Sequence, residues 1–595
     1  MVAAVPRSGT PETSPTAPPS PTPLTPAKAP AARKPSPRRR LLVSAVVVLA
    51  VALLFIAYLH VSRTYPENSD ESNDLLMGWD LLHGNLLLHG WYLSDVSFIT
   101  TELPQYALLV GLLGLHTDTA HVAAAMTYTL VVVFAVLLAR GSTARVPRRQ
   151  AWPRMLLTAG LMFAPQLGVG VFILLLSLGH IGTSVPLLLI WLVLDRGERF
   201  RPRWLVPVLV GLLMTWAVIA DPLVLVAGII PLVAVCAVRV IREAAAAGRQ
   251  AGGAGGAIGA DRPPGWLGSL REQWYEVALA AAAILAEGLA SLVNWLIRAG
   301  GGFLLHPVGY QLAPAHTWAK HAFVTGKGLL ALFGALPEGT SLPAPATAFA
   351  LVHLAGVALV AWSMWRVARH FLSWPDMISQ ILLVAIVVNV VLYVPSTLAD
   401  ATDLNAREFA VVLPFGAVLA GRTLASGLRG RAIAANDAND ANDATEGPGW
   451  ARWQQGLAVA LLAVYAASLG YAAAQPSVPA AYTQLEAFLA AHHLTRGIGG
   501  YWESSVVTVT SGGAVVIRAV GPDLLEPDMW ESKFAWYDPA TQRATFLVTD
   551  SASGFFNHWE PRASALASLG RPVRTYHVGT YTIYVWDKNL LADLP

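Results

Sequence analysis

The chain has 595 residues, of which 55% are hydrophobic and only 13% charged, and its mean hydropathy is +0.51. Soluble domains carry about 25% charged residues, so this composition excludes an ordinary soluble enzyme and a disordered protein. The single cysteine, Cys236, excludes an intramolecular disulfide and a cysteine-type zinc cluster, and the net charge of +3 gives no indication of nucleic-acid binding.

The first 40 residues form a low-complexity tail with eleven Pro, nine Ser or Thr, and seven Lys or Arg. Such a segment cannot bury enough apolar surface to order itself, so we expect it to be disordered. It ends in three arginines, directly before the apolar run 41–59. This run is longer than the apolar core of a signal peptide. We therefore predict an uncleaved first helix with its N-terminus in the cytoplasm.

Hydropathy predicts a polytopic α-helical membrane protein with about eleven transmembrane helices. Their expected ranges are 41–61, 119–140, 154–178, 181–195, 204–220, 222–241, 275–298, 346–366, 376–396, 408–427 and 455–474. The apolar piece 103–115 is too short to span and is predicted to be re-entrant or interfacial. The stretches 244–265, rich in Gly and Ala, and 429–452, which contains the repeat ANDANDANDA, are expected to be flexible cytoplasmic linkers.

Arginine is concentrated in the connections that are cytoplasmic if the N-terminus is inside. The opposite connections hold few cations: Arg63, Arg298, Lys320, Lys327 and Arg407. By the positive-inside rule this asymmetry sets the orientation in the plasma membrane. It places the large loop 62–103 and the C-terminal segment 475–595 on the extracytoplasmic side.

The C-terminal segment 475–595 changes character. A short amphipathic helix is predicted over 484–492, and strand-like runs over 505–510, 514–518, 544–548 and 581–586, separated by turn residues. We expect a small extracytoplasmic α/β domain of about 120 residues, a typical size for a small domain.

Acidic residues are clustered just after the first helix. Glu67, Asp70, Glu71, Asp74 and Asp80 fall within 14 residues. The spacing predicts an amphipathic helix over 70–82 that lies in the membrane interface, with acids toward water or a cavity. Aromatic residues are interleaved with these acids, as sugar-binding surfaces often require, and Asp95 and Glu102 add two more acids. The alternative interpretation is a solvated polar face.

The other external loops supply cations that complement these acids. The loop after the seventh helix holds His306, His316, Lys320, His321 and Lys327. Arg407 is the only Arg in the loop before the tenth helix, and it lies where that helix begins, an end that favours anions. Arginine binds phosphate through a planar fork. The alternative for Arg407 is a local ion pair with Asp403 or Glu408.

A cytoplasmic N-terminus, one helix and then a large external loop opening with the pair Asp70-Glu71 resemble the GT-C superfamily. These are integral-membrane glycosyltransferases that use polyprenyl-phosphate sugars, and the pair is similar to the one in protein O-mannosyltransferases and aminoarabinose transferases. The stretch GNLLLHGWYLSDVSFITTELPQYALL looks like one in actinobacterial membrane proteins of this type. The chain lacks the oligosaccharyltransferase motif WWD.

The resemblance implies that an acceptor hydroxyl attacks a lipid-linked sugar at the outer leaflet and that polyprenyl phosphate leaves. It implies Asp70 as general base, with Glu71 second. Arg407 is then the candidate for the leaving phosphate, with His306 and Lys320 as weaker ones. Asp74, Asp95, Glu102 and Glu408 are expected to bind substrate. The acceptor would be an extracytoplasmic glycan, lipid or protein. A divalent cation such as Mg²⁺ or Mn²⁺ could take part, but no ligand spacing requires one.

Two other classes of function remain open from the residues alone. A transporter or flippase of lipid-linked precursors would place ionisable residues along the middle of its helices. Here the predicted spans are almost free of charge, with Glu287 as the main exception. A non-catalytic membrane scaffold with a binding C-terminal domain is the second alternative.

Overall fold

The computed structural model describes residues 36–142, 146, 148–165, 167–176, 180–253, 273–307, 311–336, 344–399, 403–426, 452–552 and 558–595. Residues 51–595 form one compact unit, and the description below concerns that unit. The repeat ANDANDANDA and nearly all of the predicted disordered tail lie outside the described residues.

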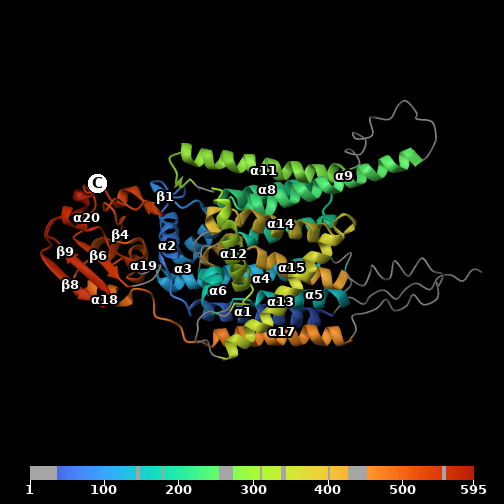
Figure 1. Cartoon of the computed structure of the whole chain (residues 1–595), viewed down its shortest axis with the longest axis horizontal. Helices are drawn as coiled ribbons and strands as arrows, with labels where there is room; N and C mark the ends of the chain where they lie inside the picture. Colours follow the sequence, from blue (N-terminus) through green and yellow to red (C-terminus); the bar gives the residue numbers. More distant parts are fainter. Residues whose placement is uncertain are drawn as a thin grey trace, which may run out of the picture. The chain divides into compact units, whose positions relative to one another are not determined.

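Each predicted span corresponds to helical structure (Figure 1). The main helices are α1 (Pro37–Ser62), α4 (Thr117–Arg140), α5 (Arg148–Met162), α7 (Ser184–Asp195), α8 (Leu205–Ala220), α9 (Ile230–Gly253), α11 (Trp274–Ala299), α13 (Ala344–Arg369), α14 (Met377–Tyr393), α15 (Val412–Ser426) and α17 (Arg452–Ala473). Among the described residues, five helical stretches are long and apolar enough to cross a membrane by themselves: α1, α4, Leu225–Ala246, α11 and Pro345–Arg369. The total of eleven spans stays a prediction.

Two predicted boundaries were wrong. The expected span 154–178 is interrupted: α5 ends at Met162, and the short α6 (Val169–Val171) leads into a π-helical turn, η1 (Phe172–Leu176). Pro165 lacks an N–H donor and disfavours helix in the residue before it, which explains the break. The expected linker 244–265 begins as helix, because α9 continues to Gly253.

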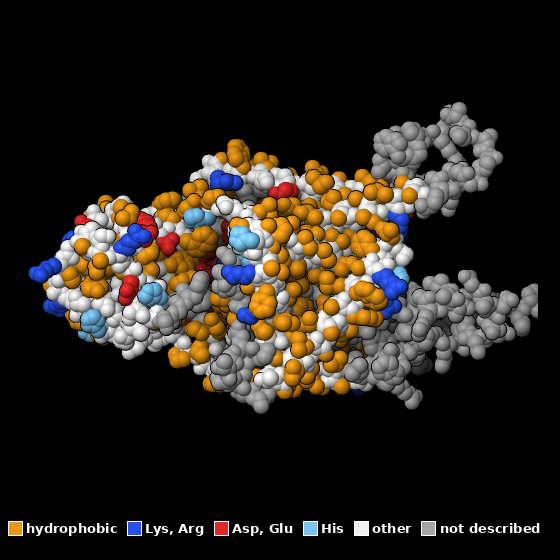
Figure 2. Space-filling model, viewed as in Figure 1, with side chains coloured by type: hydrophobic (Ala, Val, Ile, Leu, Met, Phe, Trp, Pro, Cys, Tyr) orange, Lys and Arg blue, Asp and Glu red, His pale blue; other side chains and the backbone are white. Residues whose placement is uncertain are grey.

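Small residues and buried hydroxyls hold the helices together. α8, α9 and α11 lie side by side (Figure 1), and a Cβ on Gly211 of α8 would lie 3.2 Å from the Cβ of Ala282 on α11. Tyr58 of α1 packs edge-on against Tyr128 of α4, and both hydroxyls donate to the carbonyl oxygen of Met162 at the end of α5. Apolar side chains cover most of the helical region seen in Figure 2, as a lipid-facing surface requires.

A buried arginine ties four segments together at the end of the helices that is predicted to be cytoplasmic. Arg422 of α15 donates to both carboxylate oxygens of Asp376, at 2.8 Å each, and to Asp195 at the end of α7, also at 2.8 Å. Its Nη1 donates to the carbonyl oxygen of Leu138 in α4 at 2.7 Å. The guanidinium charge is thereby paired and hydrogen-bonded, as a buried charge must be.

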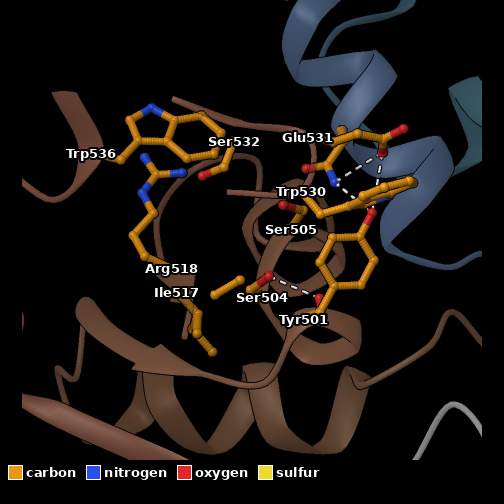
Figure 3. Close-up of a pocket in the computed structure, with 11 residues that line it drawn as sticks. Tyr501, Ser504, Ser505, Ile517, Arg518, Trp530, Glu531, Ser532 and Trp536 are labelled. Carbon is orange, nitrogen blue, oxygen red and sulfur yellow. Dashed lines mark hydrogen bonds between the residues drawn. The ribbon is translucent and has the colours of Figure 1, made fainter. Parts of the chain in front are cut away.

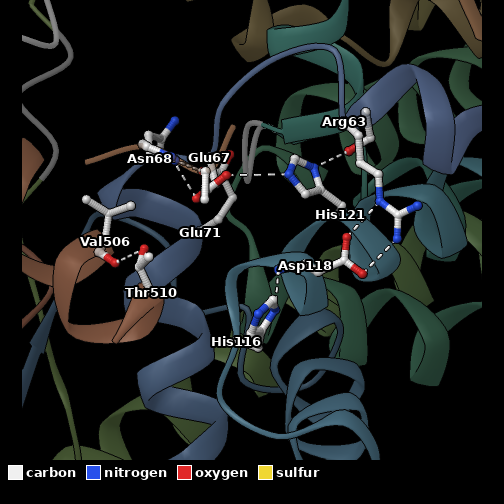
Figure 4. Close-up of polar contacts among 12 residues, drawn as sticks. Arg63, Glu67, Asn68, Glu71, His116, Asp118, His121, Val506 and Thr510 are labelled. Carbon is white, nitrogen blue, oxygen red and sulfur yellow. Dashed lines mark hydrogen bonds and ion pairs between the residues drawn. The ribbon is translucent and has the colours of Figure 1, made fainter. Parts of the chain in front are cut away.

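At the opposite end, the first loop predicted to be external forms α2 (Ser69–Leu82) and α3 (Glu102–Leu113), close to the predicted 70–82 and 103–115. Gly78 lets the two helices cross closely, because a Cβ there would lie 2.9 Å from the backbone nitrogen of Ala107. The chain between α1 and α2 is tied down by a two-bond ion pair of Arg63 with Asp118, both bonds 2.7 Å long (Figure 4).

Three short strands from distant parts of the chain join above α2. β1 (Trp91–Leu93) pairs in parallel with β2 (Leu304–Leu305) and antiparallel with β5 (Ser532–Lys533). The loop after α11 contributes β2, and after it comes α12 (Trp318–Leu332). This small sheet therefore links two external loops to the C-terminal segment.

The C-terminal segment holds a sheet of six strands in the order β4-β3-β6-β9-β8, with β7 also paired to β6. Its strands are β3 (Arg496–Gly499), β4 (Val516–Ala519), β6 (Phe546–Ser551), β7 (His558–Trp559), β8 (Arg574–Val578) and β9 (Tyr581–Val585), and its helices are α18 (Thr483–Ala491), α19 (Tyr501–Thr510) and α20 (Ala563–Ser568). The α18, β4, β6 and β9 elements lie at predicted positions. The division into a separate domain from residue 475 stays a prediction.

The predicted strand 505–510 was wrong, because these residues lie in the helix α19. Its run of Val and Thr favours strands, but β-propensity depends strongly on surroundings. Here α19 packs between α2 and β4 and is buried on most sides. The hydroxyls of Thr508 and Thr510 donate to carbonyls one turn earlier, which satisfies them inside a helix.

Candidate active site

Asp70 and Arg407, 337 positions apart in the printed sequence, meet at the predicted outer ends of the helices. Asp70 lies in the first turn of α2, where the side chain of Asn68 caps the helix by accepting from the Asp70 N–H at 2.8 Å. Arg407 lies in the short helix η7 (Asp403–Phe409) before α15. Its Nη1 is 3.6 Å from Asp70 Oδ2, and its Nε is 3.6 Å from Oε1 of Glu408.

The guanidinium of Arg407 retains capacity for another anion. Its side chain is 34% exposed, and both carboxylate contacts are longer than hydrogen bonds. Burial lowers its pKa, but the charges of Asp70 and Glu408 outweigh this and raise it. The predicted local pair with Glu408 is therefore present together with a contact to Asp70, while the side chain of Asp403 lies outside the described part.

The C-terminal segment completes the surroundings of Asp70. The hydroxyl of Tyr501, the first residue of α19, donates to Asp70 Oδ1 at 2.8 Å. The same hydroxyl oxygen lies 3.1 Å from Glu531 Oε2 (Figure 3). The side-chain amide of Asn73 donates to both the phenol oxygen and Glu531, at 3.1 and 3.3 Å. The Ser69 hydroxyl contacts the Tyr501 carbonyl at 2.7 Å. Thus α19 begins directly against the first turn of α2.

Glu71 has a structural position at the start of α2. Its carboxylate accepts from the backbone N–H of Asn68 at 3.0 Å, which completes a capping box (Figure 4). Glu71 is only 1% exposed. Burial first, and the charge of Asp70 second, raise the pKa of Glu71 well above its usual range. The predicted second member of the pair thus faces the helix start, while Asp70 faces Arg407 and Tyr501.

Asp74 lies one turn further along α2 and is 1% exposed. Burial raises the pKa of Asp74, and the charges of Glu531, Glu102 and Asp70 raise it further. One of its carboxyl oxygens has no hydrogen-bond partner among the described residues. Asp74 and Glu531 therefore form a buried, proton-holding region next to Asp70.

A second polar group lies beside Arg407 and comes from three short external connections. His180 contacts Asp221 Oδ2 through Nδ1 at 2.7 Å and Glu408 Oε2 through Nε2 at 3.1 Å. Thr183 also donates to Asp221. Burial lowers the pKa of His180, but the two carboxylates outweigh it and raise the pKa well above its usual value. His180 is therefore a buried cation that holds both acids in place.

Asp95 and Glu102 border this second group. Burial raises the pKa of Asp95, the charge of His180 lowers it, and Glu408 raises it again. The carboxyl group of Glu102 lies against Gly182, where a Cβ would collide with it. Both predicted acids therefore face the interior of the site.

Three predicted residues lie elsewhere. His306 is stacked on Tyr92, with ring centroids 4.2 Å apart, and it is 5.0 Å from the ring of Trp530. Lys320 lies exposed on α12. Asp80, at the end of α2, accepts from Lys533 at 2.6 Å and links α2 to β5.

Sequence reasoning did not assign Tyr501, Glu531, His180 or Asp221 to the site. A signal existed for two of them: His180 and Asp221, like Arg407, fall in connections predicted to be external. The topology alone brings such connections to one side of the membrane. No comparable signal marked Tyr501 or Glu531.

The possible divalent cation stays a prediction. Among the described residues, no group of three or more His, Cys, Asp or Glu side chains is arranged to hold a metal ion. Asp70, Glu408, Asp221 and Glu531 instead contact Arg407, His180 or Tyr501.

No protein-family model matches the chain, and no curated protein matches its sequence. Among solved structures, it resembles ArnT from Cupriavidus metallidurans, a crystal structure bound to undecaprenyl phosphate, with a TM-score of 0.49, 12% identity, and coverage of 92% of this chain and 98% of that one. It also resembles the Archaeoglobus fulgidus oligosaccharyltransferase in complex with Zn and sulfate, with a TM-score of 0.41, 12% identity, and coverage of 84% and 67%.

Proposed function

We propose that this chain is a membrane glycosyltransferase that transfers a sugar from a polyprenyl-phosphate donor to an extracytoplasmic acceptor. The observation that carries the proposal is the position of Asp70 beside Arg407. A carboxylate able to accept a proton and a half-exposed guanidinium able to bind phosphate lie 3.6 Å apart. Both are at the predicted outer ends of the helices, where a lipid-borne substrate arrives.

Asp70 and Arg407 have different roles in a single displacement at the anomeric carbon of the sugar. The acceptor hydroxyl oxygen forms a bond to the anomeric carbon, and the bond from that carbon to the phosphate oxygen breaks. Asp70 takes the hydroxyl proton, a general-base role that typically contributes roughly 10²–10⁴-fold. The electron pair of the broken bond stays on the polyprenyl phosphate, whose growing charge Arg407 stabilises.

The surrounding acids have supporting roles in this proposal. Glu408 contacts both Arg407 and His180, so it positions the phosphate-binding guanidinium. Asp95 and Glu102 face the same region and are candidates for binding sugar hydroxyls. Asp74 and Glu71 are buried on the same helix as Asp70, and their raised pKa values favour the neutral acids. The acceptor is an extracytoplasmic glycan, lipid or protein.

Substitution of Asp70 by Asn tests the proposal. Asp70→Asn keeps the volume and the hydrogen bond from Tyr501 but removes the base, so turnover should fall by roughly 10²–10⁴-fold while donor binding persists. The assay is consumption of a fluorescent lipid-linked sugar by purified protein at matched expression. Asp80→Asn is the matched control, because Asp80 lies on the same helix but contacts Lys533.

Three outcomes are informative. Near-normal turnover in Asp70→Asn would refute Asp70 as base. A larger loss in Asp74→Asn would move the base one helical turn along α2. If the purified wild-type protein moves lipid-linked sugar across a vesicle membrane without cleaving it, the chain is a transporter and the proposal is wrong.

A further inference from the structure

Three oxygen atoms lie in a row between α2 and the C-terminal segment. Asp70 Oδ1 is 2.8 Å from the Tyr501 hydroxyl oxygen. That hydroxyl oxygen is 3.1 Å from Glu531 Oε2 (Figure 3). Both distances are in the hydrogen-bond range, so two protons are needed for the two contacts. Tyr501 supplies only one, and burial raises its pKa well above 10, so it stays a neutral phenol.

The amide of Asn73 limits where the second proton can be. Its Nδ2 donates to the phenol oxygen and to Glu531, so it cannot accept a hydrogen bond from either. The phenol oxygen can accept from Asn73 and from one further donor. A hydrogen bond between the phenol oxygen and Glu531, in addition to the one from Tyr501 to Asp70, therefore takes its proton from one of the two carboxyl groups.

We propose that Asp70 and Glu531 share a single proton through Tyr501, and that this proton rests on Glu531 so that Asp70 stays ionised. In this state Glu531 donates to the phenol oxygen, and the phenol donates to Asp70 Oδ1. The other oxygen of Asp70, Oδ2, faces Arg407 and is left to take a proton from the acceptor. Tyr501 and Glu531 are thus positioning residues that act through Asp70.

The surroundings of the two carboxyl groups favour this assignment. Glu531 is buried, with 7% of its surface exposed, whereas Asp70 lies 3.6 Å from the guanidinium of Arg407. Burial first, and the charge of Asp70 second, raise the pKa of Glu531. The charge of Arg407 also acts on Glu531, but the contact of 3.6 Å is with Asp70. Asp74 is a buried acid that adds no positive charge, and the hydrogen bonds from Ser94, Asn73 and Tyr501 oppose the rise in the pKa of Glu531 without reversing it.

Infrared spectroscopy of the purified full-length protein tests the shared proton without any enzymatic assay. At neutral pH one component of the carbonyl band of protonated carboxylic acids should be present in the wild type and lost in Glu531→Gln, while components from other buried acids such as Asp74 and Glu71 remain. Tyr501→Phe should shift the same band, because its hydrogen-bond acceptor is gone. Glu526→Gln, an exposed glutamate of the same segment, is the matched control and should leave the band intact. An unchanged band in Glu531→Gln would overturn the inference.

A pH–rate profile tests the consequence for Asp70 and rests on the proposed function. Glutamine mimics a neutral glutamic acid, so Glu531→Gln should keep neutral-pH turnover within roughly threefold, while Glu531→Ala and Tyr501→Phe should lose about tenfold. In the wild type, turnover should fall at alkaline pH as Glu531 loses its proton. Glu531→Gln has no such proton and should lose this alkaline decline.

The two experiments separate failure of this inference from failure of the proposed function. A carbonyl band that depends on Glu531 in a protein with no transferase turnover would refute the function and leave the shared proton standing. Normal turnover with an alkaline decline that survives in Glu531→Gln would refute the shared proton and leave the function standing.

Discussion

Arg407 offers the sharpest test of how the site binds an anionic donor. Arg407→Lys keeps a positive charge but removes the planar fork that matches phosphate. If one charge-assisted hydrogen bond is lost, worth about 1.5–3 kcal/mol, kcat/KM should fall by roughly 10–100-fold. Arg407→Ala removes the charge as well. The attraction between this charge and the phosphate, at about 4 Å and an effective dielectric of about 20, is about 4 kcal/mol. Its loss lowers kcat/KM by roughly 10³-fold as an upper bound.

The exposure of Arg407 reduces these numbers, because 34% of its side chain is in contact with solvent and exposed charges are screened. The assay measures kcat/KM for the lipid-linked sugar and, separately, binding of the polyprenyl phosphate product. Thermal unfolding of each variant is followed in parallel, since Arg407→Ala leaves Asp70 without the guanidinium and leaves Glu408 with His180 alone. Lys320→Ala is the control, because Lys320 is a predicted external cation that lies exposed on α12.

Combining Arg407→Lys with Asp70→Asn distinguishes two explanations for a loss of activity in the single variants. If Arg407 binds phosphate independently of the base, the losses in Arg407→Lys and Asp70→Asn should be close to additive. If Arg407 only pairs with Asp70, the second substitution should add little to the first. Unchanged phosphate binding in both Arg407 variants would refute the reasoning and leave Arg407 as a structural ion pair.

Three further outcomes are expected. Arg422→Met should lower stability by about 3–5 kcal/mol, seen as loss of folded protein in a detergent size-exclusion profile, because Asp195 and Asp376 would keep buried charges without their cation. The raised pKa of His180 means that its contribution to stability is present at low pH and is lost as pH rises through its folded pKa. The unfolding temperature of the wild type should therefore fall toward that of His180→Asn at strongly alkaline pH, and a constant difference between them would contradict this. A reporter fused after residue 595 should be extracytoplasmic and one in the 435–444 repeat cytoplasmic; a cytoplasmic C-terminus would contradict the orientation.

The external helices could be predicted closely from sequence because their signals are local. Asn68 with Glu71 three residues later is a capping box, and the apolar spacing after it predicts a helix; α2 begins at Ser69, one residue from the prediction. The helix α19 could not be predicted in this way. Its Val and Thr run favours a strand, and only packing against α2 and β4 makes it helical.

The part of the site that could be predicted is the part for which the membrane topology alone decides on which side a residue lies. Orientation places the connections around Asp70 and Arg407 on one side, and the structure brings these two residues together. The predicted orientation could not show which of Arg407, Lys320 and His306 lies beside Asp70, since all three fall in loops predicted to be external. Tyr501 and Glu531 depend on how the C-terminal segment docks, which no local pattern encodes.

The docking of α19 on α2 also fixes when during synthesis the site is completed. Asp70 and Tyr501 are 431 positions apart, so at about 5–20 residues per second the ribosome delivers the phenol roughly 20–90 s after the carboxylate. Nascent chains therefore carry Asp70 without its phenol partner, and the contacts around this carboxylate are complete only after the C-terminal segment has emerged.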